Sequence, residues 1–393
     1  MAIISSTGTC RPCLGRLTYL LTEIVFLGLY YQWSRVGSVR QFMQIAIAHF
    51  SNRIFAFLND NGRKERKRMR QTLPSILAYP RIHLTLVDMG FNGYRRNGGA
   101  GFAIDRPTVR VEASPSSTLK IRDDRRVGFR DYELLRLERV LTEASTELAL
   151  DSRLSFVISG EMPTHSGFGS TTAVRLACLE LLLLANDMEP DQTLLSRLSK
   201  RGGTSGIGIN TYFVGGLVVD LGHPHHNGPA RPSSLAEMTP GCATPLLRAE
   251  MPAWPAGVVV PALPLLTESA EKSFFANFKP LTQGDVAEIL YHVVSGVAAG
   301  VLETNRSTFT SAINALQECA WKRQEVAEYG PGVKSERKSL ESLGAEGVAM
   351  SSLGPALFFI SDDTSSVVAN RRSNGAFLAT EVAFQNTGRC LEW

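Results

Sequence analysis

The sequence predicts an α+β fold with two domains, and three observations support this prediction. Several short runs alternate apolar and polar residues, which is typical of half-buried strands. Other runs repeat apolar residues every three or four positions, which indicates amphipathic helices. The strands and helices mix without a regular βαβ rhythm, and a length of 393 residues suits about two domains.

The predicted N-terminal domain covers residues 76–225. Its first strand is expected at 80–88 (PRIHLTLVD), where apolar and polar residues alternate. A turn at 92–97 and the glycine-rich run 98–101 lead into a second strand at 102–104. The further expected elements are strands at 108–113 and 153–159, a helix at 131–149, a helix ending near 186, and a short helix at 191–200 capped by Asp191.

A long loop or linker at 226–256, rich in Pro, Gly, Ser and His, separates this domain from a C-terminal domain at 257–393. In the C-terminal domain we expect strands at 257–261, 356–360 and 376–383, and helices near 283–301, 306–326 and 361–372.

Residues 1–75 form an N-terminal extension of unknown role. Its apolar stretch Leu17–Trp33 is short and carries Glu23 near the middle, whereas a spanning helix needs about 20 predominantly apolar residues. The basic run at 63–70 would suit a cytoplasmic flank, but we expect no membrane insertion.

Charge and cysteine content narrow the class of protein. The formal net charge is only +4, and much of the excess lies in residues 63–70, so no cationic face for nucleic acid is indicated. Six scattered cysteines form no disulfide framework, which favours a reducing cytoplasm as the location.

The first candidate site is the loop Gly167-Phe168-Gly169-Ser170-Thr171-Thr172, which opens a long apolar helix. Glycines permit a tight backbone path, and a helix N-terminus presents unpaired amides at the positive end of its dipole. A phosphate or pyrophosphate is the natural ligand of such a loop. The same residues also suit a plain helix cap in which Ser170 satisfies its own first turn.

The second candidate segment, residues 201–223, reads RGGTSGIGINTYFVGGLVVDLGH, and its glycines are too dense for an ordinary strand or helix. We expect it to bring backbone amides close to the same anion, so that the two segments bind one phosphorylated small molecule. The binding residues expected here are Arg201, Gly202, Gly203, Thr204, Ser205 and Gly206.

Three motifs resemble the GHMP small-molecule kinase superfamily in their order: PRIHLTLVD, PTHSGFGSTTA, and GVAMSSLGP at 347–355. Within it the chain resembles the β-ribofuranosylaminobenzene 5′-phosphate synthase family. The matching features are Arg81-Ile-His83 followed by Asp88, a P-x-H-x-G-x-G-S loop, a nearly complete RGG-[TS]-SGIGI…GG…VD-x-GH segment, and Arg231-Pro-Ser-Ser234. The resemblance spans residues 78–360 and leaves 1–75 outside.

The resemblance implies a GHMP kinase-like two-domain fold and a homodimer. The N-terminal domain would be like domain 2 of ribosomal protein S5, and the C-terminal domain would be ferredoxin-like. It also implies an activity: phosphoribosyl pyrophosphate is joined to p-aminobenzoate, or a similar aromatic acid, with loss of pyrophosphate and CO₂. This step is early in methanopterin-type cofactor biosynthesis. Mg²⁺ is the implied cofactor, and Ser170 or Thr171 would reach it.

Two alternatives stay open. One is an ATP-dependent small-molecule kinase on the same fold, and the other is a non-catalytic regulator that binds a phosphate or a nucleotide. Many kinases of the superfamily carry an Asp after Ser-Gly-x, but Gly208 follows Ser205-Gly206-Ile207 here, which weakens the kinase reading without eliminating it. Leu353 occupies a position where an aromatic residue is common, so the sequence does not define the pocket for the aromatic acceptor.

Further side chains are candidates by chemistry. His165 and His83 can carry protons near neutral pH, although each can instead be a structural histidine. Arg81 and Arg201 can bind a phosphate or carboxylate bidentately. The candidates for holding Mg²⁺ are Thr171, Asp88 and Asp220, the two aspartates also being common turn formers. The C-terminal motif adds Ser351, Ser352 and Gly354 as site candidates.

Overall fold

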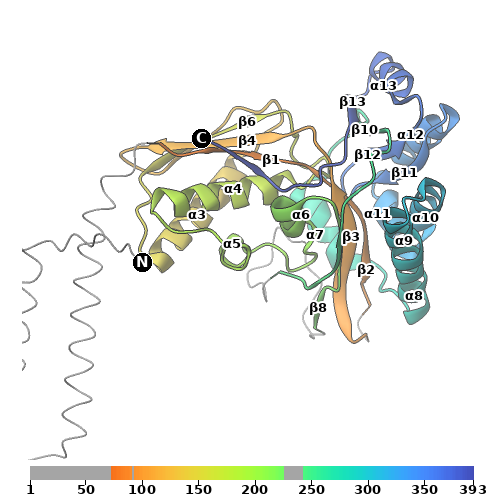
Figure 1. Cartoon of the computed structure of the whole chain (residues 1–393), viewed down its shortest axis with the longest axis horizontal. Coiled ribbons are helices and arrows are strands. Elements are labelled where there is room, and N and C mark those ends of the chain that lie inside the picture. Colours follow the sequence, from red (N-terminus) through yellow and green to blue (C-terminus); the bar gives the residue numbers. More distant parts are fainter. Residues whose placement is uncertain (1–71, 91–92, 225–241) are drawn as a thin grey trace, which may run out of the picture. The chain divides into compact units, whose positions relative to one another are not determined.

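The computed structural model describes residues 72–90, 93–224 and 242–393 (Figure 1). These residues belong to one compact unit, Arg70–Trp393. The predicted extension at 1–75 lies outside the described residues except for its last four positions. Residues 226–241 of the predicted linker, including the motif at 231–234, also lie outside them.

The first sheet has the strand order β14-β1-β4-β6-β5, in which only the β5–β6 pair is parallel. Its strands are β1 (Ser75–Ala78), β4 (Val109–Pro115), β5 (Lys120–Asp123), β6 (Leu154–Gly160) and β14 (Cys390–Glu392). Strand β14 comes from the end of the chain and covers the edge of β1. The last residues of the predicted C-terminal domain therefore belong to a sheet of the N-terminal region. This pairing satisfies backbone N–H and C=O groups that the edge strand β1 would otherwise expose.

The second sheet has the order β2-β3-β7-β9, with β8 paired to β3 off this path. Its strands are β2 (Arg81–Asp88), β3 (Arg95–Ala103), β7 (Leu217–Asp220), β8 (His223–Pro224) and β9 (Pro245–Ala249). The run 98–101 was expected only to lead into a strand, but β3 passes through it. A Cβ on Gly99 would lie 3.0 Å from His83 Nε2, and one on Gly101 would lie 2.3 Å from the Ile82 carbonyl oxygen. These glycines therefore permit close packing.

Four helices accompany these sheets: α3 (Asp131–Leu148), α4 (Ser170–Ala185), α5 (Gln192–Ser199) and α6 (Ile207–Val214). Helix α4 is buried on nearly all sides, packs against β4 and β1, and is flanked by α3, α5 and α6 (Figure 1). The predicted cap of α5 is confirmed, because Asp191 Oδ1 accepts a hydrogen bond of 2.9 Å from the Leu194 amide. The glycine-dense segment after Arg201 contains α6, a helix that its glycines did not predict.

The C-terminal region is built on an antiparallel sheet with the order β11-β12-β10-β13. Its strands are β10 (Ala256–Val260), β11 (Glu346–Met350), β12 (Leu357–Ile360) and β13 (Leu378–Val382). Its helices are α7 (Glu268–Asn277), α8 (Gln283–Tyr291), the π-helix η1 (His292–Ala298), α9 (Ala299–Leu302), α10 (Arg306–Glu318), α11 (Ala320–Ala327), α12 (Pro331–Ser342) and α13 (Thr364–Ser373). Strand, helices, two strands, helix and strand follow one another, which is the expected ferredoxin-like arrangement.

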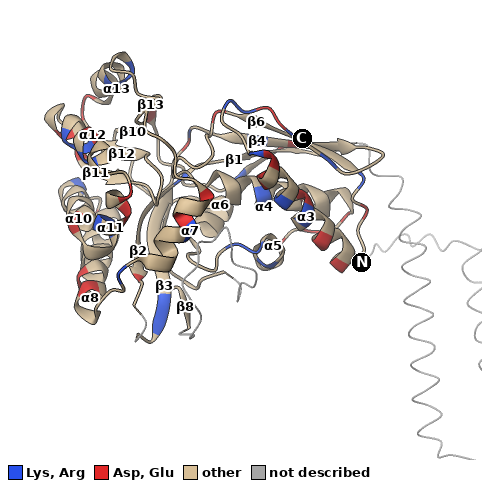
Figure 2. Ribbon diagram, turned by 180° about the vertical axis from the view of Figure 1, so that it is seen from behind, with Lys and Arg blue, Asp and Glu red and all other residues tan. Residues whose placement is uncertain are grey.

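Within the described residues, one helical run, Gln283–Leu302, is long and apolar enough to cross a membrane by length and composition. Its η1 segment lies against α10, since a Cβ on Gly296 would be 2.3 Å from Ala312 Cβ. A core helix of a soluble protein passes the same test. Figure 2 shows positions of Lys and Arg interspersed with those of Asp and Glu along the described chain, and two basic residues, Arg95 and Arg96, begin β3.

Candidate functional site

The predicted glycine loop opens α4 in the expected way. Gly167 and Gly169 have φ values of 97° and 79°, in the left-handed region that favours glycine. Gly169 is the N-cap, so no side chain caps the helix, and its carbonyl accepts from the amides of Thr172 and Ala173. The amides of Ser170 and Thr171 find no acceptor in the described part of the chain. The structure therefore shows an open helix N-terminus here and not a helix capped by Ser170.

Three arginines surround this loop. Arg81 begins β2 and donates to the Gly167 carbonyl oxygen, while Arg201 Nε donates to Thr172 Oγ1 at 3.0 Å. Arg175 lies on α4 and donates through Nη1 to the Ser199 carbonyl oxygen at 2.9 Å. The contact between Arg201 and Thr172 joins the two segments that were predicted to form one site.

No carboxylate of the described residues pairs with these three guanidinium groups. Nε of Arg81 and Nη1 of Arg201 are shielded from solvent and have no hydrogen-bond partner among the described residues. Burial, with repulsion from Arg201, lowers the pKa of Arg81 to about 10 and that of Arg175 to about 9. Burial likewise lowers the pKa of Arg201 to about 10. All three remain charged at neutral pH. Glu271 and Glu325 attract Arg201 and Arg81 electrostatically but form no ion pair with them, so enclosed guanidinium groups without a paired carboxylate indicate a binding site for an anion.

Two adjoining cavities meet at Arg81 and Arg201, and the residues shared by both walls also include Glu271, Ser352 and Leu353. The first cavity is the one that contains the glycine loop. Its wall further includes Phe129, Glu133, Arg136, Leu137, His165, Gly167, Gly169, Ser170, Thr171, Arg175, Leu266, Glu268 and Gly354. The second cavity is lined by His83, Leu86, Thr172, Gly202, Thr204, Ser205, Gly208, Ile209, Phe275 and Glu325.

His83 faces the second cavity and belongs to a hydrogen-bonded chain. Its Nε2 lies 3.2 Å from Ser205 Oγ, which in turn lies 3.2 Å from Asp220 Oδ2. Burial, with the charge of Arg81, lowers the pKa of His83 well below its ordinary value, so the imidazole is neutral at pH 7. When Ser205 donates to Asp220, His83 donates through Nε2, and Nδ1 is left as an acceptor. This Nδ1 is buried and has no hydrogen-bond partner among the described residues.

Asp220 organises the glycine-rich segment. Its Oδ2 accepts from the Gly206 amide at 3.0 Å, and its Oδ1 accepts from the Gly222 amide at 2.8 Å. Burial raises the pKa of Asp220 to about 6. Nearby, the Gly202 carbonyl oxygen lies 2.7 Å from His223 Nε2. Asp220 therefore shapes the backbone that carries Ser205.

His165 lines the first cavity and contacts a residue that the sequence did not identify. Its φ is 60°, and its Nε2 lies 2.9 Å from Glu133 Oε1. Glu133 Oε2 also accepts from the Arg130 amide at the start of α3. Although burial acts to raise the pKa of Glu133, the hydrogen bond with His165 brings it below its ordinary value. The expected structural alternative was a hydrogen bond from His165 to a loop carbonyl. Instead, the carboxylate of Glu133 orients the His165 ring.

The C-terminal motif connects the glycine loop to β2. Ser351 Oγ accepts from the His83 amide at 3.0 Å and donates to the Gly167 carbonyl oxygen at 2.7 Å. The Ser352 amide donates to the His83 carbonyl oxygen at 2.9 Å. A Cβ on Gly354 would lie 2.1 Å from the Gly167 amide nitrogen. Ser351 and Gly354 thus hold the loop in place, while Ser352 also lines both cavities.

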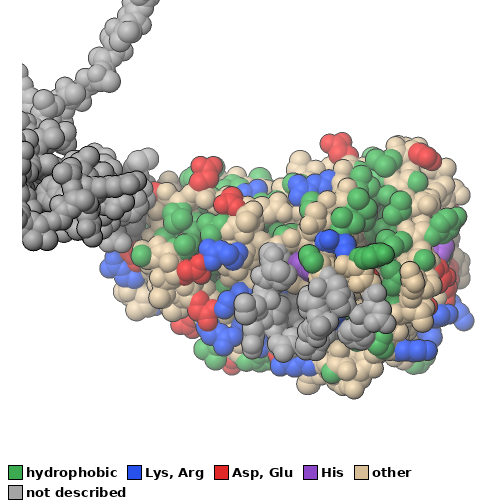
Figure 3. All heavy atoms as spheres, turned by 90° about the horizontal axis from the view of Figure 1, so that it is seen from below, with side chains coloured by type: hydrophobic (Ala, Val, Ile, Leu, Met, Phe, Trp, Pro, Cys, Tyr) green, Lys and Arg blue, Asp and Glu red, His purple; other side chains and the backbone are tan. Residues whose placement is uncertain are grey.

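The structure does not bring the three residues predicted for Mg²⁺ together. Thr171 lines the first cavity, whereas Asp88 and Asp220 line a separate, largely apolar cavity of about 720 Å³ beside β3 and α8. Asp88 Oδ1 accepts from the Gly90 amide, the turn-forming contact that was the alternative. The lower face of the molecule, which Figure 3 shows, carries exposed apolar side chains among charged ones.

The sequence analysis did not predict the charged residues Glu133, Arg136, Arg175, Glu268 and Glu271 of the first cavity. Glu271 lies on α7, and burial raises the pKa of its carboxyl group. Arg175 interrupts the apolar run of α4, and this interruption is visible in the sequence. In the structure Arg175 is only 6% exposed, which is unusual for an arginine. Glu271 belongs to a helix that the sequence analysis left out, so its position had no local signal.

Comparison with known proteins identifies relatives. No protein-family model matches the chain. Over 294 residues, 74% of this chain and 89% of the relative, it is 28% identical to the β-ribofuranosylphenol 5′-phosphate synthase of Methanothermobacter thermautotrophicus. Proteins of the same name from Archaeoglobus fulgidus and Methanocaldococcus jannaschii are also 28% identical, each over 72% of this chain and over 86% and 88% of their own lengths.

Solved structures share the fold at low sequence identity. Mevalonate diphosphate decarboxylase from Staphylococcus aureus matches 83% of this chain and 100% of its own, with a TM-score of 0.56 at 12% identity. Homoserine kinase from Cytophaga hutchinsonii matches 81% and 96%, with a TM-score of 0.55 at 16% identity. Phosphomevalonate kinase from Streptococcus pneumoniae matches 79% and 100%, with a TM-score of 0.55 at 12% identity. These likenesses confirm the expected GHMP kinase-like α+β fold.

Proposed function

We propose that this chain, which belongs to the β-ribofuranosylaminobenzene 5′-phosphate synthase family within the GHMP kinase superfamily, is a pentosyltransferase. It joins the ribose of phosphoribosyl pyrophosphate to an aromatic acid with loss of pyrophosphate and CO₂, early in methanopterin-type cofactor biosynthesis. The observation that carries the proposal is the cluster of Arg81, Arg175 and Arg201, three enclosed guanidinium groups beside an open helix N-terminus that form no ion pair within the described residues.

The first cavity suits the donor. Phosphoribosyl pyrophosphate carries several negative charges, which would compensate the three guanidinium groups. The amides of Ser170 and Thr171 would donate to pyrophosphate oxygens, because a helix N-terminus favours anions. The same donors stabilise the charge that develops on pyrophosphate as it leaves, which lowers the barrier to breaking the anomeric C–O bond.

The second cavity suits the acceptor. Leu86, Ile209 and Phe275 provide apolar walls for a benzene ring, and Arg81 or Arg201 can pair with its carboxylate. The name of the relatives specifies a ribofuranosylphenol, which a hydroxybenzoate acceptor would give, whereas p-aminobenzoate would give the aminobenzene. A benzoate with a para hydroxyl or amino group is the acceptor class that we propose.

The chemistry follows from the meeting of the two cavities. The ring carbon that bears the carboxylate attacks the anomeric carbon as pyrophosphate departs. CO₂ then leaves and returns its electron pair to the ring, so no net proton is removed. We propose that His83 Nδ1, which is buried and has no partner among the described residues, accepts a hydrogen bond from the para substituent, which would stabilise the positive charge that the ring carries between these steps.

The first cavity also fits the proposed Mg²⁺. Mg²⁺ prefers oxygen ligands, and the hydroxyls of Ser170 and Thr171 and the carboxylate of Glu271 line the same cavity. When bound, Mg²⁺ would neutralise charge on the departing pyrophosphate. Asp88 and Asp220 are not part of this proposed set.

Turnover with defined donors tests the proposal. The full chain is incubated with phosphoribosyl pyrophosphate and carboxyl-labelled p-amino- or p-hydroxybenzoate, and separately with ATP and candidate alcohols. We expect equal amounts of pyrophosphate and labelled CO₂ without ATP. Formation of ADP alone would support the kinase alternative, and tight binding without turnover would support the regulator. Gly208, at the position where many of the kinases carry an Asp, lies beside Thr172 and offers no carboxylate.

We also propose a cytoplasmic homodimer, on the support of the family resemblance and the unpaired cysteines. Cys178, Cys242, Cys319 and Cys390 are free thiols. Size-exclusion chromatography with light scattering tests the dimer, and a monomer would contradict it.

A further inference from the structure

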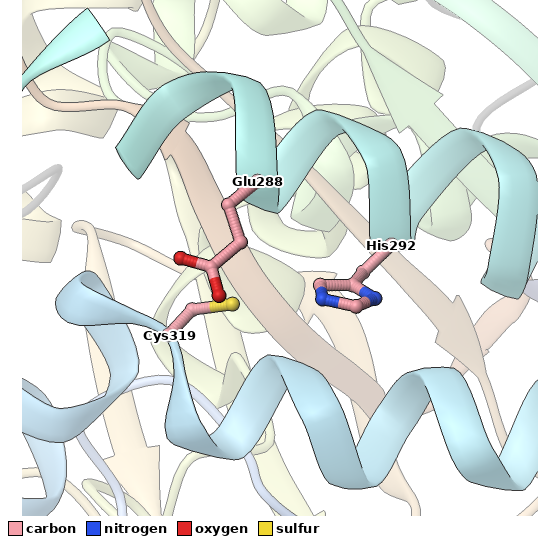
Figure 4. Close-up of side chains that lie close together, drawn as sticks. All are labelled: Glu288, His292 and Cys319. Atoms are coloured by element: carbon pink, nitrogen blue, oxygen red, sulfur yellow. The ribbon is translucent and has the colours of Figure 1, made fainter. Parts of the chain in front are cut away.

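A cluster of three metal-binding side chains lies outside both cavities. Glu288 on α8, His292 at the start of η1 and Cys319 between α10 and α11 each direct one ligand atom to a common point, as Figure 4 shows. The three ligand atoms all lie within 4.8 Å of one another. The reaction proposed above uses none of these residues.

The local backbone explains why the three side chains meet. Glu288 and His292 are four residues apart, which places them on one face where α8 continues into η1. A π-helical segment inside a longer helix is frequently found at functional sites. Cys319 has extended backbone angles of −67° and 154° and ends α10, and its thiol donates to the Ala315 carbonyl oxygen at 3.5 Å. The close contact of Gly296 with Ala312 brings η1 and α10 together.

We propose that Glu288, His292 and Cys319 form a zinc-binding site. The donor set of one imidazole nitrogen, one thiolate sulfur and one carboxylate oxygen is typical of Zn²⁺, and magnesium or calcium sites use oxygen alone. Tetrahedral zinc with bonds of about 2.0–2.3 Å holds its ligand atoms about 3.3–3.8 Å apart. The exposed Glu288 side chain can close this difference by a change of rotamer.

The surrounding charge favours a divalent cation. Burial has the largest effect on the Cys319 thiol and raises its pKa; Glu288, Asp285 and Glu318 act in the same direction, and Arg323 opposes them. Asp285 also bonds Thr282, and Glu318 pairs with Arg337 at 2.6 Å. Arg323 and Arg337 offset part of this negative charge, whereas the Glu288 carboxylate forms no ion pair within the described residues and would be neutralised by a metal ion.

Three protein ligands leave a fourth coordination position for water or an external ligand. The site would link α8 to the start of α11. In α11, Lys322 donates to the Met350 carbonyl oxygen at 3.1 Å and pairs with Glu325, a residue of the second cavity. Zinc should therefore raise the melting temperature of the folded chain, because it binds a site that exists only when α8 and α11 are packed together.

Zinc titration of the full chain tests the site. The background carries Cys10→Ser and Cys13→Ser, since that thiol pair would compete for zinc. After chelator treatment, calorimetric titration with Zn²⁺ should show one site, and Co²⁺ should give a thiolate-to-cobalt charge-transfer band. Cys319→Ser should abolish the band, and His292→Ala and Glu288→Gln should each weaken zinc binding at least about tenfold. Cys390 is exposed, so Cys390→Ser serves as the control and should change neither the cobalt charge-transfer band nor the zinc affinity.

Two outcomes would overturn the proposal. One is the absence of stoichiometric zinc binding in the Cys10→Ser/Cys13→Ser background. The other is zinc binding that responds to Cys319→Ser but not to Glu288→Gln or His292→Ala, which would show an isolated thiol. Because Glu288 is exposed, Glu288→Gln remains informative if Cys319→Ser impairs folding, which circular dichroism would report. Retained turnover with phosphoribosyl pyrophosphate keeps this result separate from the proposed function.

Discussion

Replacing Arg201 by methionine should stabilise the ligand-free protein and weaken pyrophosphate binding. Burial lowers the pKa of Arg201 from its ordinary value to about 10, and a fall of more than two pKa units corresponds to about 3 kcal/mol. At neutral pH this arginine is charged in both the folded and the unfolded chain, so the whole cost is present. Loss of the hydrogen bond to Thr172 offsets about 1–2 kcal/mol. The free energy of unfolding of Arg201→Met should therefore rise by about 1–2 kcal/mol.

The same substitution removes a charged donor from the anion site. A hydrogen bond to a charged group contributes about 1.5–3 kcal/mol, so the affinity for pyrophosphate should fall roughly tenfold to hundredfold. Differential scanning calorimetry with and without pyrophosphate measures both effects, and for a chain of this length one kcal/mol corresponds to a shift of about 1–2 °C. Arg197→Met is the matched control, because this half-exposed arginine pairs with Glu147 away from both cavities. A destabilised Arg201→Met with an unchanged response to pyrophosphate would refute the reasoning.

Three further predictions follow from the same geometry. Gly169→Ala should weaken pyrophosphate binding, because φ is 79° and the new Cβ would lie 3.2 Å from the Arg81 guanidinium. The control is Gly330→Ala, where φ is 55° and the new Cβ would meet open space. This control should lose a similar amount of stability and leave pyrophosphate binding unchanged in a parallel titration. His83→Gln should lower kcat about a hundredfold and leave the KM for phosphoribosyl pyrophosphate unchanged in steady-state assays. Asp220→Asn should change how unfolding free energy depends on pH, as measured by denaturant titration between pH 4 and 7.

The sign of the Asp220 effect follows from its raised pKa. Because the folded pKa is about 6 and the unfolded pKa is near 4, the folded chain takes up this proton more readily. Its contribution to stability is complete below pH 4 and is lost as the pH rises through 6, by about 3 kcal/mol. Asp220→Asn should lack this loss. Parallel pH profiles of the wild type and Asp220→Asn would contradict the raised pKa of Asp220. An unchanged kcat of His83→Gln would contradict the role of His83, and equal losses of pyrophosphate binding in Gly169→Ala and Gly330→Ala would contradict the role of the glycine loop.

The sequence predicted those parts of the fold that depend on local pattern. Strand β2 and helix α3 follow from their apolar periodicity, helix α4 follows from its long apolar run, and the two site segments follow from their glycines. Strand β14 has three residues and no period of its own, so only its pairing with β1 makes it a strand. From the sequence alone, the glycines of β3 suit either a turn or a strand against which the side chains of His83 and Ser205 pack closely. That distinction requires the tertiary structure.

The site was predictable where backbone geometry determines it and less so where side chains from distant elements converge. Gly167, Gly169 and Arg201 were found because dense glycines beside a helix start indicate an anion site. Glu133 and Glu271 come from α3 and α7, which meet the loop only in the folded chain. The structure does not bring the three predicted Mg²⁺ ligands together. The sequence shows that Asp220 has a carboxylate, but it does not show that one side-chain and two backbone groups already donate to that carboxylate.

A crystal structure with Mg²⁺ and pyrophosphate tests the central claim most directly. The account predicts pyrophosphate in the first cavity, with its oxygens at hydrogen-bond distance from the amides of Ser170 and Thr171 and from the guanidinium groups of Arg81 and Arg201. Pyrophosphate bound instead along the apolar cavity beside Asp88, with the arginine cluster unliganded, would contradict it.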